Sequence, residues 1–339
     1  MGMKIYDKWG NVKGLADYRE PARWKFAQPT LQDVHPVDPV TTRLSIATRN
    51  EQFSWDKLAP VAEVDEQSGT IPIYTAGFWF RRQEGAERAP DGAYLRVGYG
   101  VTTDTYACHE IGFEKLLGDV IRAGSQLPDD LQDVDTQFLT NLMQLELEKR
   151  VAAAGFVTGV WGTSTTPGAT AKWDQYDTSD PIANADTAIR TIRRATGVKP
   201  NSLFIGALAW ENLKEHPLIL DKYKHTQVGI MTPELVAPVL GVPEIIVGES
   251  VEETTAEGGA GTRADIWTDN ALFLVRNEPG LMVQNGMYTL MWNEKGNIPW
   301  GIEPYREEQR RGNVTRIFTH QHPKIVSSAH GYIYLDVIT

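Results

Sequence analysis

The most regular pattern of apolar positions lies between Pro128 and Gly155. Apolar side chains recur there every three or four residues, which is the repeat of one face of an α-helix; they are Leu131, Val134, Phe138, Leu142 and Leu145. Acidic residues precede the repeat and suit a helix start. The pattern predicts a helix over about residues 129–154, a spine of about 40 Å at 1.5 Å per residue.

Shorter patterns follow after Asp180. Pro181 suits the first turn of a helix, and Gly197 suits its end. The stripe of this helix expected to be buried is Ile182, Ala185, Ile189 and Ile192. Continuous apolar runs predict buried strands at 203–206 and 244–248, and helices are expected over about 207–215 and 233–241. Beyond residue 264 the chain has mostly the patterns of strands.

Two segments offer little core of their own. Residues 1–50 contain four prolines and several aromatic residues without a sustained period, which indicates an extended arm. Residues 65–107 resemble a long two-stranded excursion with a polar tip at 83–92. Because ordering a chain costs backbone entropy, both segments are expected to gain their stability from neighbouring subunits.

The composition is that of a globular protein. The 339 residues are 41% hydrophobic and 23% charged. Apolar runs stay well below the roughly 20 residues of a membrane span, and no apolar stretch follows the first residues as in a signal peptide. We therefore expect a soluble protein that stays in the compartment where it is made. The single cysteine, Cys108, excludes an intrachain disulfide and is expected to be a small buried apolar residue.

Charge is unevenly distributed. The net charge is −11, yet residues 1–50 carry eight basic and five acidic side chains, which is +3 and leaves −14 on the rest. A dedicated DNA-binding protein normally presents a basic stripe. The acidic body argues against that class.

The sequence shows no recognisable catalytic group. Residues 162–166 lack the second glycine of a nucleophile elbow, and nucleotide-binding glycine patterns are absent. Cys108 and His109 are adjacent, so on a strand they point to opposite faces. The expected set of catalytic and cofactor-binding residues is therefore empty.

Two further pairs of polar residues were considered. His320 and His322 share one strand face, but a third metal ligand is missing nearby, so no metal site is expected. Glu146 and Glu148 lie two positions apart and cannot share a helix face. Both are expected to be solvated charges.

The order of these parts resembles the major capsid proteins of tailed, double-stranded DNA bacteriophages. The similar stretches are residues 53–60, 65–74 and, most specifically, 179–203, followed by His216-Pro217 and Val247-Gly248. The resemblance covers roughly residues 50–339. It implies an α+β, Hong Kong ninety-seven-like capsid fold with an N-terminal arm, an extended β-hairpin loop, a long spine helix, and peripheral and axial domains.

The resemblance also divides the chain into parts. These are the arm (1–50), the start of the peripheral domain (51–64), the extended loop (65–107), the peripheral domain with the spine helix (108–180), the axial domain (181–290) and the return strands of the peripheral domain (291–339).

By the same resemblance, the chain is a non-enzymatic shell subunit. It is expected to form pentamers and hexamers of an icosahedral head around double-stranded DNA, contacted weakly and without sequence preference. It would be found in the virion, assembled in the host bacterial cytoplasm, with a portal protein and a scaffolding protein as partners and no membrane contact. A decoration protein stays open. The short arm suggests that scaffolding is a separate protein or absent.

Charged residues of the extended loop are the expected contacts between subunits. They are Arg81, Arg82, Glu84, Glu87, Arg88 and Arg96. Some relatives join their loops covalently through a lysine, but the chain has none between Lys57 and Lys115. Arginine stays protonated and cannot replace it as a nucleophile. Non-covalent contacts are therefore expected.

Three other readings were weighed. An encapsulin, a cellular cargo shell of the same architecture, differs by a helical N-terminus that binds cargo, whereas residues 1–50 have no helical pattern. An enzyme with an unrecognised site would need residues that the sequence does not reveal. An adhesin or tail-fibre module would favour repeats and an all-β pattern, which the predicted spine helix contradicts.

Overall fold

The computed structural model describes ten stretches of the chain, which are residues 3–6, 12–16, 53–74, 76–84, 86–88, 90–124, 130–223, 231–255, 261–293 and 299–339. Two units separate, residues 1–36 and 37–339. In the first, β1 (Met3–Tyr6) and β2 (Val12–Ala16) pair antiparallel. This hairpin was not expected in the arm, because strands of four and five residues are too short to show a period. The rest of the arm prediction lies outside the described residues.

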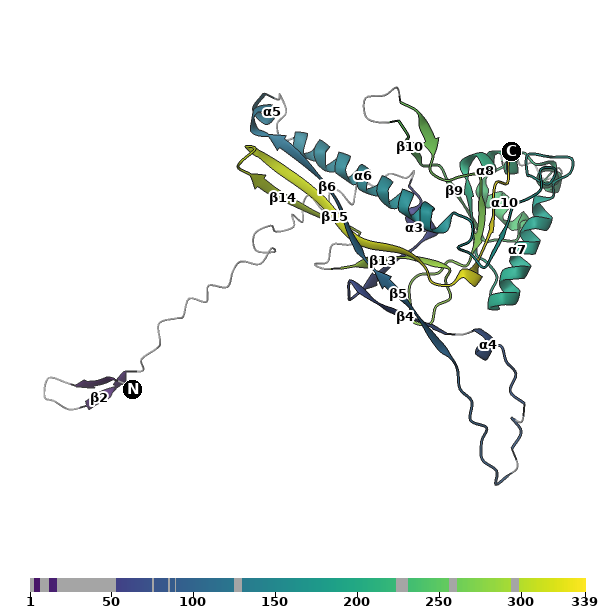
Figure 1. The fold of residues 1–339 in the computed structure, drawn as a ribbon, viewed down its shortest axis with the longest axis horizontal. Coiled ribbons are helices and arrows are strands. Elements are labelled where there is room, and N and C mark those ends of the chain that lie inside the picture. The colour runs from purple at the N-terminus through teal and green to yellow at the C-terminus, as the bar shows by residue number, and fades with distance from the viewer. Residues whose placement is uncertain are drawn as a thin grey trace. The chain divides into compact units, whose positions relative to one another are not determined.

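One sheet of the second unit has the order β14-β15-β13-β3, and β6 pairs with β15 as well. Its strands are β3 (Val61–Val64), β6 (His109–Gly118), β13 (Met287–Trp292), β14 (Gly301–Glu307) and β15 (Gly312–Ile325). The long helix α6 (Asp130–Gly155) runs along β6 and β15 (Figure 1). Between β6 and α6 lies the short helix α5 (Asp119–Gly124). This helix-on-sheet layer contains the first apolar core.

The helix predicted over 129–154 is confirmed by α6, but the predicted face is wrong. Its buried apolar residues are Leu139, Met143, Leu147, Val151 and Ala152. Val134 and Phe138 are instead 55% and 50% exposed. Apolar residues occur on two faces of this helix, so spacing alone could not tell which face meets the sheet.

A second sheet has the order β7-β16-β12-β8-β9. Its strands are β7 (Thr163–Thr165), β8 (Ser202–Gly206), β9 (Glu244–Gly248), β12 (Ala271–Leu274) and β16 (Gly331–Tyr334). Four helices accompany it: α7 (Pro181–Thr196), α8 (Ala207–Lys214), α9 (Pro217–Tyr223) and α10 (Pro233–Val239). The predicted helices and buried strands of this region are thus confirmed, with boundaries shifted by one or two residues.

Strand β8 shows why the region is apolar throughout. Leu203 and Ile205 point into the core beneath the helices, whereas Phe204 joins the first core. All five residues are therefore buried. A strand covered on both faces has a continuous apolar run and no alternation.

The predicted domain boundaries stay predictions, but one strand lies elsewhere than expected. The sequence prediction places all of residues 291–339 in the peripheral domain. The structure instead pairs β16 with β12 and β7 of the second sheet, and the 3-10 turn η1 (Ser328–His330) precedes it. An apolar strand pattern does not say which of two sheets it completes.

The two ends of the extended loop pair with each other and form its base. β4 (Ser68–Tyr74) and β5 (Val101–Ala107) pair antiparallel, and α4 (Ala76–Trp79) follows β4. The predicted two-stranded excursion is confirmed at this base. The remaining elements are the short helix α3 (Trp55–Leu58) and the hairpin of β10 (Val251–Glu253) and β11 (Arg263–Asp265). Among the described residues, no helix is long and apolar enough to cross a membrane.

Candidate assembly surfaces and the interior that positions them

Among the described residues, Glu148 is a buried carboxylate that accepts hydrogen bonds from five donor groups. Its side chain is completely buried, which corrects the expectation of a solvated charge. Its carboxylate accepts the backbone N–H groups of Ser54 (3.0 Å) and Trp55 (2.7 Å) and the Ser54 hydroxyl (3.1 Å). It also accepts the Ser250 hydroxyl (2.7 Å) and the Trp267 indole N–H (2.6 Å).

These donors come from three separate places in the chain. Ser54 and Trp55 begin α3, Ser250 follows β9, and Trp267 follows β11. The Trp267 ring then packs on Phe204 of β8 at 4.4 Å between centroids. Five donor groups saturate a carboxylate, so no lone pair is left for a substrate. Glu148 therefore joins the spine helix to the second sheet and to the start of α3.

Ser179 and His216 form a buried pair that sequence reasoning missed. The Ser179 hydroxyl lies 2.9 Å from Nε2 of His216, as a nucleophile would lie from its base. However, Nδ1 of His216 accepts the backbone N–H of Leu218 at 3.3 Å. Nδ1 is therefore unprotonated. Nε2 carries the proton and donates a hydrogen bond to the oxygen of Ser179. A ring in this tautomer cannot deprotonate Ser179.

The pair instead lies beside two helix starts. Asp180 accepts the N–H of Ala183 at 2.9 Å and caps α7, while His216 holds the first turn of α9. Burial lowers the pKa of His216, which keeps the ring neutral.

Cys108 is buried, as predicted, and its thiol contacts the Leu290 carbonyl at 3.7 Å. Burial raises the pKa of this thiol. His320 lies 3.9 Å from Glu110, and the rings of His109 and His322 are 6.5 Å apart. Within the described ranges, no group of three metal-ligating side chains comes together.

The six charged residues proposed for the loop are all exposed: Arg81, Arg82, Glu84, Glu87, Arg88 and Arg96. One of them is engaged within the loop itself. Arg88 donates to the Gly92 carbonyl at 2.8 Å and stacks over the Tyr94 ring at 4.4 Å. The other five make no hydrogen bond or ion pair with any residue that the structure describes. Five charged side chains are therefore free to meet another molecule.

Aromatic residues at the base of the loop are a feature that charge reasoning overlooked. The rings of Tyr74, Trp79 and Tyr99 lie 5.8 to 6.4 Å apart. Phe80 packs on Gly197, the left-handed residue that ends α7. A Cβ atom at Gly197 would come within 2.9 Å of that ring. The base of the loop is thus seated on the end of α7 by small apolar contacts.

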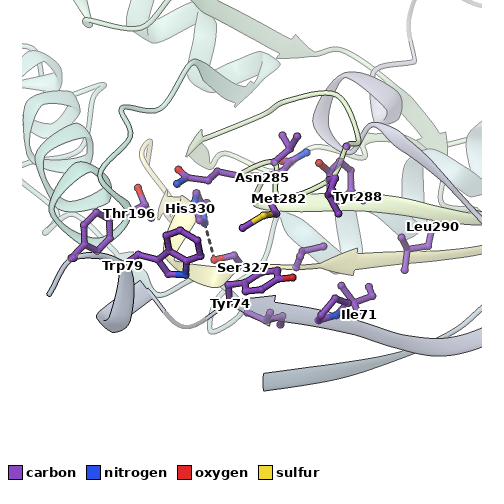
Figure 2. Close-up of a pocket in the computed structure, with 18 residues that line it drawn as sticks. Ile71, Tyr74, Trp79, Thr196, Met282, Asn285, Tyr288, Leu290, Ser327 and His330 are labelled. Atoms are coloured by element: carbon purple, nitrogen blue, oxygen red, sulfur yellow. Dashed lines mark hydrogen bonds between the residues drawn. The ribbon is translucent and has the colours of Figure 1, made fainter. Parts of the chain in front are cut away.

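Behind these aromatics lies a cavity of about 510 Å³. Figure 2 shows Trp79, Met282, Tyr288 and His330 around it. Its wall contains no aspartate, glutamate, lysine or arginine. Nδ1 of His330 is bonded to the Ser327 hydroxyl at 2.7 Å, whereas its buried Nε2 has no partner among the described residues. The cavity can therefore hold an uncharged group that offers one hydrogen-bonding partner.

Comparison with known proteins places the chain in a family. Residues 162–299 match the family model of phage major capsid protein E. The major capsid protein of Burkholderia phage BcepMu is 30% identical over 224 residues, which are 65% of this chain and 71% of that protein.

Solved structures show the same fold. A phage-related protein from Bordetella bronchiseptica superposes with a TM-score of 0.71 at 20% identity, over 90% of this chain and 98% of that one. The capsid of Cyanophage P-SCSP1u gives 0.52 at 10% identity, over 82% and 86%. The fold is thus α+β and Hong Kong ninety-seven-like, as predicted, and the relatives do not favour the encapsulin alternative. This chain belongs to the phage major capsid proteins, the structural subunits that form the shell of the virion.

Proposed function

We propose that the chain assembles into pentamers and hexamers of an icosahedral head that encloses double-stranded DNA. The observation that carries this proposal is the uncovered loop. Leu95, Val97 and Tyr99 are each at least half exposed, and the five free charges lie on the same segment. An isolated subunit gains nothing from such a surface, whereas copies around a shell cover it.

The five free loop charges are the proposed polar contacts between subunits: Arg81, Arg82, Glu84, Glu87 and Arg96. Planar guanidinium groups suit paired hydrogen bonds to carboxylates of the next copy. Arg88 has a different proposed role, because its contacts with Gly92 and Tyr94 hold the tip in shape.

Further partners follow from the same role. We propose a portal protein and a separate scaffolding protein, assembly in the host bacterial cytoplasm, and weak DNA contact. The +3 charge of residues 1–50 against −14 on the rest supports an arm on the inner wall near DNA. A catalytic role is not part of the proposal, since the two buried polar groups that resemble active-site chemistry are fully used in structure.

The test is assembly of the purified chain, alone and with its scaffolding protein. Sedimentation velocity and negative-stain microscopy should show closed shells or rings of five and six subunits. A stable folded monomer at micromolar concentration under both conditions would contradict the proposal.

A further inference from the structure

The rim of the cavity presents apolar side chains to solvent. Leu281, Met282 and Val283 are 92%, 55% and 40% exposed. Met282 also has a backbone φ of 57°, a left-handed conformation that costs a non-glycine residue free energy. A strained backbone that holds apolar side chains in solvent is expected where another molecule covers those side chains.

A second uncovered apolar surface lies on the extended loop of the same chain. Leu95 and Val97 are 50% and 65% exposed. They are two residues apart, so in an extended segment they lie on one side, and Arg96 lies on the other. Residues 93–100 form no strand in this chain, which leaves their backbone N–H and C=O groups available to a partner.

We propose that Leu95 and Val97 of a second copy of this chain enter the cavity behind Trp79 and beside Met282. This inference rests on the proposed function and names the place where the loop of the next subunit is received. The cavity wall has no ionised side chain, and the entering side chains are apolar, so neither surface has to desolvate a charge. Nε2 of His330 then meets a backbone polar group of the entering segment.

The cavity and residues 93–100 lie at different places on one chain, so contact between them joins two copies head to tail. Such contacts are not self-complementary, so each copy receives one neighbour and enters another. Repetition closes into a ring when the rotation between copies divides a full turn. Rings of five and six, as proposed for this chain, are contacts of this kind.

Two single substitutions test the contact. Val97→Cys and Met282→Cys chains are produced together and allowed to assemble, then oxidised mildly. Cys108 is the only native cysteine and is buried, so it does not compete. A disulfide-linked dimer joining residue 97 of one chain to residue 282 of the other is expected. The matched control pairs Val97→Cys with Leu208→Cys, an exposed residue of α8, and should give at least tenfold less dimer.

Photo-crosslinking identifies the occupant directly. Met282 is replaced by p-benzoylphenylalanine in shells that mix isotopically light and heavy chains. Cross-linked peptides should contain residues 93–100 of another copy. Peptides from residues 17–52, or from a different protein, would overturn the inference. Normal shells without the 97–282 dimer would overturn it as well and leave the proposed function standing, whereas failure of unsubstituted chains to form shells or rings refutes the proposed function itself.

Discussion

The indole N–H of Trp267 donates a 2.6 Å hydrogen bond to Glu148, although 119 residues separate the two along the chain. The bond ties the spine helix to the segment that follows β11. Glu148 also accepts hydrogen bonds from the backbone N–H groups at the start of α3 and from the Ser250 hydroxyl. One carboxylate therefore positions three parts of the fold.

Replacing this carboxylate should destabilise the subunit strongly. Glu148→Gln places an amide N–H₂ among five donors and leaves some of them unsatisfied, at a cost of about 2–4 kcal/mol. Urea unfolding of unassembled subunits measures the loss. The control is Glu146→Gln. This substitution removes an ion pair with Arg150 on the exposed side of α6, and its loss should cost under about 0.5 kcal/mol. Equal losses for the two variants would contradict the role of Glu148.

Helix α7 and Glu148 show which features the sequence could predict and which it could not. The start and end of α7 depend on Asp180, Pro181 and Gly197, which act within a few residues of themselves, so local patterns predicted them. The role of Glu148 depends on Ser250 and Trp267, more than a hundred residues away. No local rule reports such donors, and a glutamate on a helix is normally solvated.

The candidate surface was predicted in part. Loop charges stood out because basic and acidic residues cluster around the turn signals at 83–92. The cavity did not, since its wall brings together residues from β4, α4, β13, the segment before β13 and the segment after β15. The exposed stretch 281–283 gives one sequence signal that was overlooked, three apolar residues that follow Pro279 and Gly280.

Reversing loop charges should block assembly and spare the fold. Arg81→Glu combined with Arg82→Glu is expected to leave circular dichroism and the urea midpoint unchanged, because neither side chain bonds to a described residue. Shell yield by sedimentation should fall at least tenfold. Arg88→Ala is the comparison within the loop and should act by loosening the tip, so its defect should be insensitive to salt. An unaltered yield for the double variant would rule out these contacts.

Acid should destabilise the subunit through one buried and two half-buried histidines. Burial lowers the pKa values of His216, His322 and His330. The unfolded imidazoles, with pKa values near about 6.5, then bind protons that the folded rings do not. Stability is therefore full above about pH 6.5 and falls as the pH drops below it. Unfolding free energies between about pH 7.5 and pH 5 should show this slope.

A substitution measures how much His216 contributes to this dependence of stability on pH. His216→Gln keeps one donor for Ser179 and one acceptor for Leu218 without a titrating group. Whatever the overall stability of this variant, the pH dependence of its unfolding free energy should be shallower. An identical slope in both proteins would show that folded His216 binds a proton over the same pH range as the unfolded imidazole, contrary to the expectation.

Mature shells should contain no covalent links between loops. The chain has no lysine between Lys57 and Lys115, and the loop arginines stay protonated. Particles boiled in detergent and reducing agent should run as one band near 37.8 kDa. A ladder of multimers would show that another nucleophile forms the bond.

The placement of β16 sets an order of events during synthesis. This strand lies between β7 and β12, yet the ribosome makes it after every other strand of both sheets. β7 waits for its parallel partner until residue 334 has emerged. A nascent chain therefore cannot close its second sheet before residue 334 has been translated, and subunits become competent to join a growing shell only after that point.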